Sequence, residues 1–392
     1  MKRLLGFAAS ALILATYSNS ASAVSAACAT ADSLIASLNS PTCTATCRTS
    51  VQTQLDIYRI NHPECFGSTS STASATQEIH STSISQMLAI SQAVTARNRA
   101  GNTRPEKTAS VDQRFGMAAG NSPAQWNFWG SVNSDKNKYD RGMYYDPASL
   151  NNHGQTSTTN VTNAVVGGDY QLTPTVAVGV SAAFDSSSGN ALSTNYSNNT
   201  SNASSSSTSG YTVAPYIGWQ INQDWSLDAT LGTGSVKLNT TEVTGKANRT
   251  FYGANLSYAK WMGNWQLSGK GSYLHGEEKY GDLTSGAGVL LAGTGVTNKI
   301  DQMRLGGQAG YWMNDNVMPY FGLDYAADIG RSTTSTASQL GTEIGRSAWV
   351  YSLGANFFSI SNSITGGIAY HQEVGRTYSK ISNLMGNINF RF

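Results

Sequence analysis

The stretch ISNLMGNINFRF, residues 381–392, places its apolar side chains at alternate positions. Ile388, Phe390 and Phe392 fall on one parity, with asparagine and arginine between them. Because successive side chains of a β-strand point to opposite faces, this pattern predicts a strand with one apolar and one polar face. Chain termini are usually frayed and polar, so an apolar strand this late in the chain has to be held by a neighbouring strand.

The same two-residue period recurs from Trp126 onward. It is clear in 175–184, 211–221, 301–313 and 318–329, where an apolar and aromatic face opposes a small and polar one. That is the pattern of a transmembrane β-strand, with lipid on one side and a polar interior on the other. Charged residues make up 12% of the chain, about half the usual level of soluble proteins. The composition and the period together predict a transmembrane β-barrel.

Twelve strands can be counted in this way. They are predicted near 125–133, 158–170, 175–186, 209–221, 225–238, 249–262, 265–279, 299–313, 318–331, 346–358, 363–374 and 377–392. Short turns alternate with long polar loops, which are predicted at 134–157, 187–208, 280–298 and 332–345. An even strand number, one side of short turns and one side of long loops are features of outer-membrane barrels. The last strand then closes the barrel against the first and leaves no free edge.

Aromatic residues flank three of the short turns. Because Trp and Tyr favour the membrane–water interface, we expect a periplasmic girdle formed by Trp219, Trp225, Trp261, Trp265, Trp312 and Tyr320.

The N-terminus has the form of an export signal. Lys2 and Arg3 precede the apolar run 4–15, and Ala21-Ser22-Ala23 is an A-x-A site, which predicts cleavage after Ala23. The run is too short to span a bilayer of about 30 Å. The mature chain is therefore expected to leave the cytoplasm.

Residues 24–66 are predicted to form a small helical hairpin that contains all four cysteines, Cys28, Cys43, Cys47 and Cys65. An even number of cysteines in an exported segment predicts two disulfides, and three pairings are possible. Antiparallel helices over 29–39 and 44–60 would favour Cys28 with Cys65, which leaves Cys43 with Cys47. A metal site is the weaker alternative, since no histidine pair has zinc spacing.

The remaining boundaries follow from composition. Residues 67–120 are predicted as a linker that contains a helix over about 75–99, with a narrow apolar stripe on a small and polar surface. The barrel is predicted over 121–392.

These features together resemble the C-terminal outer-membrane β-barrel translocator domain of autotransporters, the type V secretion family. The resemblance covers roughly 75–392 and rests on the export signal, the helix before the barrel, the QWNFWGS first strand (125–131), twelve strands and the phenylalanine-ended last strand. It implies that the barrel-assembly machinery reads Ile388, Phe390 and Phe392, with periplasmic chaperones as further partners. It also implies a monomeric barrel in outer-membrane lipid, with helix 75–99 in the pore and the upstream module at the cell surface.

By the same resemblance, lumen charges are candidates for contact with the pore helix, although most of them are more simply explained as hydrated lumen side chains. The charged candidates are Asp169, Asp228, Lys270, Arg304, Asp324, Asp328 and Glu373. Two features depart from the family pattern. The module before the helix is short and contains cysteines, and the predicted pore helix lacks the Asn-Asn pair at which some members cut themselves inside the pore, since its end offers only the isolated Asn98 and Asn102. We therefore expect an uncleaved passenger.

Catalytic and nucleic-acid roles have little support. The sequence contains no G-x-S-x-G elbow and no H-E-x-x-H motif. His371 and Glu373, on one strand face, are more simply explained as a hydrated lumen pair. With 25 Lys+Arg against 23 Asp+Glu, the chain lacks the basic excess of a nucleic-acid binder. We expect no enzyme activity, cofactor or metal. The alternative function is a channel-like, porin-like or adhesin-like barrel with a periplasmic N-terminal module.

Overall fold

The computed structural model describes residues 85–95 and 126–391, apart from 147–150, 198, 241–242, 286–289, 292–294, 314–315, 334–343 and 362–363, together with six single residues between 37 and 54. The following lie outside the described residues: the export signal with Ala23, the linker apart from 85–95, Phe392, and the cysteines Cys28, Cys43 and Cys65. Cys47 is described and is disulfide-bonded. Its pairing stays a prediction.

Fourteen strands follow the helix in the described part of the chain. The long ones are β1 (Trp126–Asp146), β2 (Asn151–Thr173), β3 (Val176–Asn195), β4 (Thr200–Gln220), β5 (Trp225–Thr240), β6 (Val243–Met262), β7 (Trp265–Tyr280), β10 (Thr297–Tyr311), β11 (Val317–Thr333), β12 (Ser347–Ser361), β13 (Ile364–Val374) and β14 (Ser379–Arg391). The short strands β8 (Leu283–Ser285) and β9 (Leu290–Leu291) extend the end of β6.

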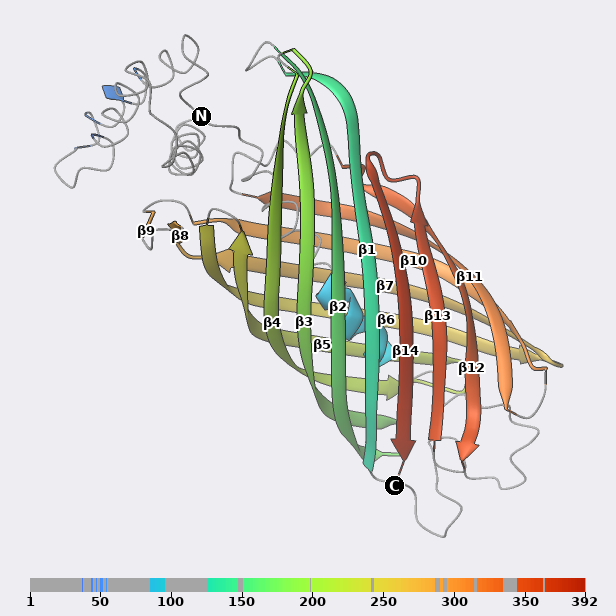
Figure 1. Ribbon diagram of the computed structural model, residues 1–392. Helices are drawn as coiled ribbons and strands as arrows, with labels where there is room; N and C mark the ends of the chain where they lie inside the picture. Colours follow the sequence, from blue (N-terminus) through green and yellow to red (C-terminus); the bar gives the residue numbers. More distant parts are fainter. Residues whose placement is uncertain are drawn as a thin grey trace.

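The twelve long strands form a closed antiparallel barrel (Figure 1). Each long strand pairs with the long strands next to it in sequence, including β5 with β6. A second kind of contact, between the first strand β1 and the last strand β14, closes the ring. In the second contact Phe128 lies opposite Phe390 and Tyr139 opposite Ser379. The predicted closure of the last strand against the first is confirmed, and the closed ring leaves no long strand with a free edge inside the bilayer.

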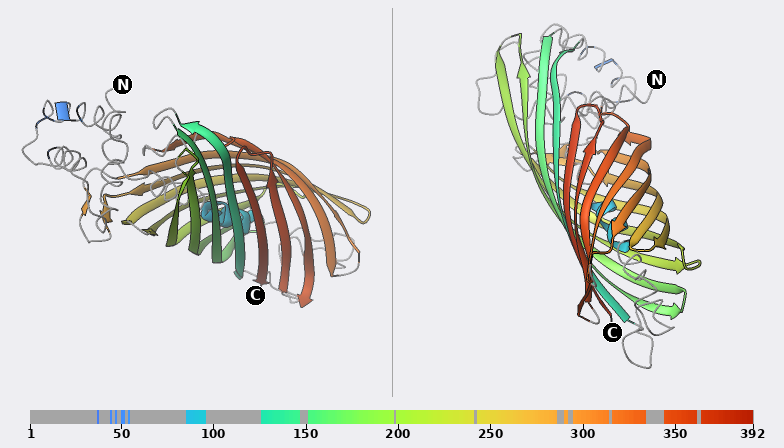
Figure 2. Two further views of the ribbon diagram at one scale, coloured as in Figure 1. Left: turned by 45° about the horizontal axis from the view of Figure 1, so that its top comes forward. Right: turned by 90° about the vertical axis from the view of Figure 1, so that its right-hand side faces the viewer.

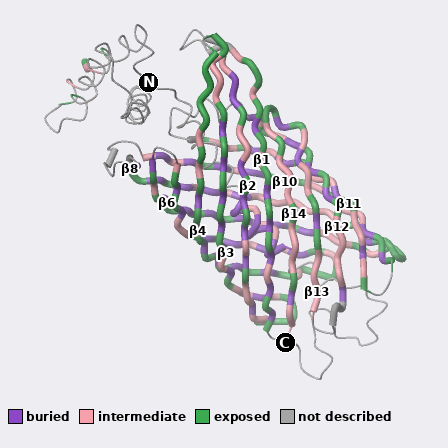
Figure 3. Tube along the Cα trace, in the orientation of Figure 1, coloured by how far each residue is buried: buried purple, intermediate pink, exposed green. Residues whose placement is uncertain are grey.

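Side chains alternate between the outer wall and the lumen (Figure 3). In β4, Tyr211, Val213 and Trp219 are exposed on the outside, whereas Thr212 and Ala214 are buried on the inside. An outer surface this rich in large apolar side chains is suited to lipid.

The first four strands are longer than the sequence predicted. The segments 134–157 and 187–208, which were expected to be loops, are mostly paired strand, and their connections shrink to 147–150 and 196–199. Serine and threonine hydroxyls support the extension, since Ser187 and Thr208 share a 2.7 Å hydrogen bond between paired strands. Figures 1 and 2 show this hairpin pair projecting beyond the rest of the barrel.

The barrel has two distinct rims. We name the end with connections 174–175, 221–224, 263–264, 312–316 and 362–363 the short-turn rim, and the opposite end the loop rim. The tightest turn contains Gly263 at φ 60°, a backbone conformation that glycine adopts without a steric penalty. Because outer-membrane barrels have short periplasmic turns and longer external loops, the loop rim is the outer one. Within the described residues, no helix has the length and apolar character needed to cross a bilayer.

Candidate functional site

A helix over residues 85–95 lies inside the barrel (Figures 1 and 2). Met87, Ile90 and Val94 recur at helical spacing and are buried. They pack against an apolar patch of the inner wall, formed by Trp129, Val165, Ala183, Ala214, Tyr216, Phe251 and Leu274. The helix is therefore seated on the β1–β7 side by hydrophobic burial.

One glycine makes room for this seating. A Cβ atom built on Gly276 of β7 would lie 2.1 Å from the sulfur of Met87. Real Cβ atoms do not approach other atoms so closely, so helix and wall meet at a point where only glycine fits without a shift.

The start of the helix is tied to two lumen aspartates. The Ser85 hydroxyl donates to Asp135 on β1 and accepts a 2.9 Å hydrogen bond from Asn163 Nδ2 on β2. The Gln86 amide donates to Asp185 on β3, and its Oε1 accepts a 2.9 Å bond from Thr212. Adjacent helix positions thus contact four neighbouring strands.

Asp185 belongs to a fully buried charge cluster. Arg249 of β6 contacts it at 3.0 Å through Nη1 and contacts Glu278 of β7 through Nε. All three side chains are at most 1% exposed. A buried charge is tolerated only when paired and hydrogen-bonded, so Asp185 supports Arg249 and the Gln86 amide together.

The middle of the helix has a third polar anchor. Asn255 of β6 donates 3.1 Å to Ser91 Oγ and 2.6 Å to Asp228 on β5. Asp228, one of the predicted lumen contacts, thus reaches the helix through Asn255.

The other predicted lumen charges have structural partners. Asp169 accepts bonds from Tyr216 and Asn127, and Arg304 donates to Gln302. Lys270, Arg304 and Asp324 all border a cavity beside the helix.

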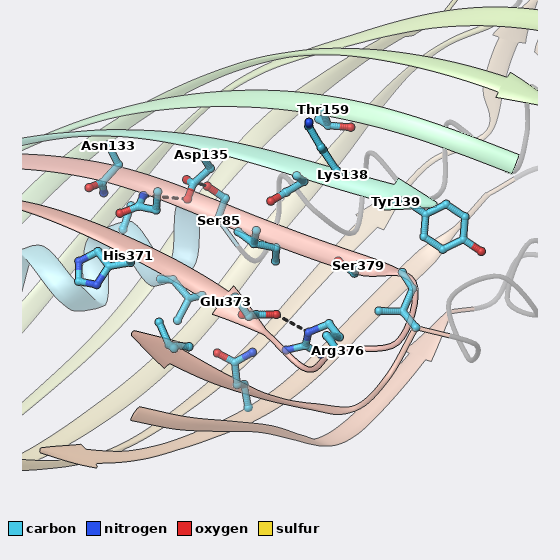
Figure 4. A pocket seen from close by; sticks show the side chains of 18 of the residues that line it. Ser85, Asn133, Asp135, Lys138, Tyr139, Thr159, His371, Glu373, Arg376 and Ser379 are labelled. Carbon is cyan, nitrogen blue, oxygen red and sulfur yellow. Dashed lines mark hydrogen bonds and ion pairs between the residues drawn. The ribbon is translucent and has the colours of Figure 1, made fainter. Parts of the chain in front are cut away.

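Asp328 and Glu373 bind arginines near the loop rim. Arg376, in the turn after β13, donates 2.6 Å to Asp328 and also contacts Glu373, which is drawn as a dashed line in Figure 4. Burial alone would lower the pKa of Arg376, but the carboxylates of Glu373 and Asp328 raise it above its ordinary value. Its guanidinium therefore stays charged and holds the turn to the wall.

Asp135 and Asp185, which bind the helix directly, were absent from the predicted contacts. Asp135 fell in a segment interpreted as a loop, so its inward orientation was hidden. Asp185 shares the parity of Ser181 and Ala183 on the polar face of β3. That parity was a signal that would have identified it.

The helix leaves part of the lumen open. One cavity of about 100 Å³ lies at the loop-rim side of the helix, bordered by Ser85, Ser379 and Ile344 (Figure 4). A second, of about 150 Å³, lies toward the short-turn rim, bordered by Thr95 and Asn389. Gln92, Arg304 and His371 border both cavities. Each is large enough for several water molecules, so open space remains beside the helix.

The lumen arrangement suits holding a helix better than acid–base chemistry. His371 shares a 2.7 Å hydrogen bond with Ser352 through Nδ1, whereas Glu373 binds Arg376. Among the described residues, no group of three or more His, Cys, Asp and Glu side chains is arranged to hold a metal ion.

Three of the residues predicted for the aromatic girdle lie on the outer wall. Trp219, Trp225 and Trp265 are exposed on the outer wall next to short turns. Trp312 is buried inside and stacks on Phe358, with ring centroids 4.9 Å apart.

Trp261 packs edge-on against Trp312, and Tyr320 borders the second cavity, so neither faces lipid. Position beside a turn was a poor guide, because strand parity decides which wall a side chain joins. Outer tyrosines that the sequence pattern did not reveal complete the ring: Trp126 packs with Tyr170, Trp225 with Tyr258 and Trp265 with Tyr311, each pair with centroids 5.0 Å apart.

Comparison with known proteins identifies the barrel. Residues 128–371 match the family model described as the autotransporter β-domain. The structure is similar to the translocator domain of the autotransporter NalP from Neisseria meningitidis, at 13% identity, covering 78% of this chain and 98% of that one, with a TM-score of 0.53. It is also similar to the β-domain of the Bordetella autotransporter BrkA, at 11% identity, covering 68% and 100%, with a TM-score of 0.49. A comparison with curated proteins found no match.

Proposed function

The chain belongs to the autotransporter β-domain family, and we propose that its barrel carries the upstream segment through the outer membrane and displays the 24–66 module at the cell surface. The family is one of transport barrels of the Gram-negative outer membrane, which gives the barrel its location and its general role. Display of the short module is the part that we propose.

The direction of the lumen helix is the observation that carries this proposal. Its first residue, Ser85, borders the cavity that also contacts Arg376 and Ser379 of the loop rim. Its last, Thr95, borders the cavity that also contacts Gln266 and Asn389 near the short-turn rim. The described helix therefore runs from the loop-rim side at Ser85 to the short-turn side at Thr95.

The barrel ends agree with this direction. Trp126 and Arg391 both lie at the short-turn rim, where β1 begins and β14 finishes. A chain that runs down the pore through the helix and then enters β1 from the periplasmic side needs no second crossing. This path supports a surface position for everything upstream of the helix.

The test is surface labelling of intact cells. In one variant an epitope is inserted after Ser25, and in a second, separate variant the same epitope is placed in the 196–199 turn as a control for the loop rim. Labelling of both epitopes without permeabilisation is the expected result. If the turn is labelled and the N-terminal epitope appears only after permeabilisation, the module is periplasmic and the display proposal fails.

A second candidate function is conduction beside the helix. The two cavities beside the helix favour it, because they leave space in the lumen that the helix does not fill. Planar-bilayer recordings would show small current steps for the full chain and larger steps once 85–95 is deleted. Silence in both forms would exclude a channel.

The passenger is proposed to remain attached. We expect immunoblots of the outer membrane to show one band that contains both the 24–66 module and the barrel. Cleavage at the start or the end of the predicted helix 75–99 would release a fragment of about 50 to 80 residues, counted from Ala23. The appearance of such a fragment in the culture medium would contradict this expectation. The proposed partners are outer-membrane lipid, the barrel-assembly machinery and periplasmic chaperones, with the barrel as a monomer.

A further inference from the structure

Several lysines of the barrel lie on its outer wall, although Lys270 borders the lumen cavity. On the consecutive strands β5, β6, β7 and β10, the lysines Lys237, Lys246, Lys279 and Lys299 have outward parity and are exposed. Arg249 of β6 has inward parity and is buried in the lumen wall. We call the four outward lysines the lysine band.

The band lies at a uniform height. Lys237 follows Trp225 by twelve residues on β5, and Lys299 precedes Tyr311 by twelve on β10. With a rise of about 3.3 Å per residue and a strand tilt of about 40°, twelve residues raise the side chain by roughly 30 Å. The apolar band of such barrels is about 25 Å tall. If the outer aromatic pairs mark the periplasmic interface, the lysine band lies just beyond the hydrocarbon on the outer side.

Two of these lysines face each other. Lys237 and Lys246 are direct cross-strand partners on the outer wall. Side chains in that relation have Cβ atoms about 5 Å apart, and like charges there destabilise the sheet. Lys299 contacts Glu277 at 2.9 Å. Within the described part of the chain, no carboxylate contacts Lys237, Lys246 or Lys279.

The arrangement recurs elsewhere on the barrel. Lys138 of β1 and Lys380 of β14 are also direct cross-strand partners, both exposed. Lys138 follows the outer Trp126 by twelve residues, so this second pair lies at the same height. Lys138 also borders the loop-rim cavity. Repetition of opposed lysines at one level indicates a ligand that lies around the barrel at that level.

We propose that the lysine band binds the phosphate groups of phosphorylated lipids in the outer leaflet. A phosphate placed between two ammonium groups removes their repulsion and forms charge-assisted hydrogen bonds to both. The acyl chains of the same lipid contact the apolar wall below, where Leu231, Tyr252 and Leu305 are exposed. The site does not depend on what the barrel transports.

The test uses the purified full-length chain in neutral detergent. Lipid A with two phosphates is titrated in, and the midpoint of thermal unfolding is followed by loss of the compact, SDS-resistant band. The variant combines Lys237→Gln with Lys246→Gln. The matched control is Lys260→Gln, an exposed lysine of β6 at the short-turn rim.

We expect lipid A to raise the midpoint of the wild type and of the control alike. The double variant should require at least about ten times the lipid A concentration to reach half of that rise. Each lysine at a charged membrane surface contributes about a factor of five in affinity. An equal response in the double variant, or an equal response to lipid A stripped of both phosphates, would overturn the proposal. The same rise with inorganic phosphate alone would assign the site to free anions and also overturn it.

A third variant separates binding from general damage to the fold. Lys237→Glu places a carboxylate opposite Lys246, so the lipid-free barrel should unfold at a higher temperature while its response to lipid A falls. A lower lipid-free midpoint would show that the two lysines do not repel each other, and the argument from like charges would fail.

Discussion

At the scale of single residues, the lumen shows how charges are kept inside a membrane protein. The helix side chains that bind the two aspartates each have a second partner. Asn163 donates to Ser85, which binds Asp135, and Thr212 donates to Gln86, which binds Asp185. A buried network of this kind favours one geometry, because breaking one of its bonds leaves a further buried group without a partner. The position of the helix therefore depends on a few named acids.

The first prediction concerns Asp185. Asp185→Ala removes one of the two carboxylates that contact the buried Arg249 and also frees Gln86. We expect a loss on the order of 3 kcal/mol, seen as a lower thermal midpoint of the compact band. Asp140→Ala, an exposed outward site on β1, is the control and should change little. Equal midpoints for the two variants would show that the cluster contributes no stability.

At the scale of elements, the pore helix combines an apolar and a polar attachment. Its apolar stripe rests on β1–β7, and its other side, with Leu88 and Gln92, borders the cavities. Because the helix is apolar on one side, that side packs against one wall of the lumen. The open cavities then lie between the other side of the helix and the opposite wall.

The second prediction tests which side holds the helix. Ile90→Ala removes a fully buried side chain, and such truncations cost about 2–5 kcal/mol. Residue 91 labelled through Ser91→Cys should then become more reactive to a water-soluble thiol reagent. Leu88→Ala, on the cavity side, should leave the labelling rate nearly unchanged. Similar rates in both variants would contradict the assignment of the two sides.

The third prediction concerns the extended hairpin of β3 and β4. The variant removes 189–206 and joins Ser188 to Ser207, which are paired. With the rise per residue and strand tilt used above, this junction lies roughly 30 Å above the short-turn rim. Assembly should be unaffected, because the removed pairs lie outside the bilayer. The measurement is the amount and thermal midpoint of the compact band in outer membranes. A large loss of either would show that the projection is part of the folding core.

At the scale of the whole molecule, ring closure joins the two ends of the barrel sequence. β1 and β14 are separated by most of the barrel in sequence, yet they pair over thirteen residue pairs from Asn127–Arg391 to Tyr139–Ser379. Such a long-range contact forms late and at a high entropic cost, so residues at the seam are expected to affect assembly before they affect transport.

The fourth prediction follows from this seam. Deleting Phe392, at the end of the predicted assembly signal Ile388, Phe390 and Phe392, should lower the amount of folded barrel in the outer membrane. Phe392→Tyr keeps an aromatic side chain and is the control. Membrane fractions are compared by immunoblot of unheated samples. Wild-type amounts after the deletion would count against a terminal signal.

The sequence by itself determined the number of long strands, the parity of the strands with a clear two-residue period and the presence of a helix before the barrel. Both the strand pattern and the helix pattern are local. Apolar residues recur at every second position in a strand and about every 3.6 positions in a helix, so a short run of consecutive residues reveals them. Membership of a transport family was also foreseeable, because it rested on the signal, the helix and the last strand together.

Only the tertiary structure decided which wall a turn-flanking aromatic joins, how far the polar strands continue, and which acids meet the helix. Trp312 is buried although it flanks a short turn, because the last outward position of β10 is Tyr311. Serine-rich 187–208 remains paired because its partners across the hairpin continue the ladder. Asp135 and Asp185 meet Ser85 and Gln86 only once the sheet has closed around the helix, and closure is a contact between distant residues that no local pattern records.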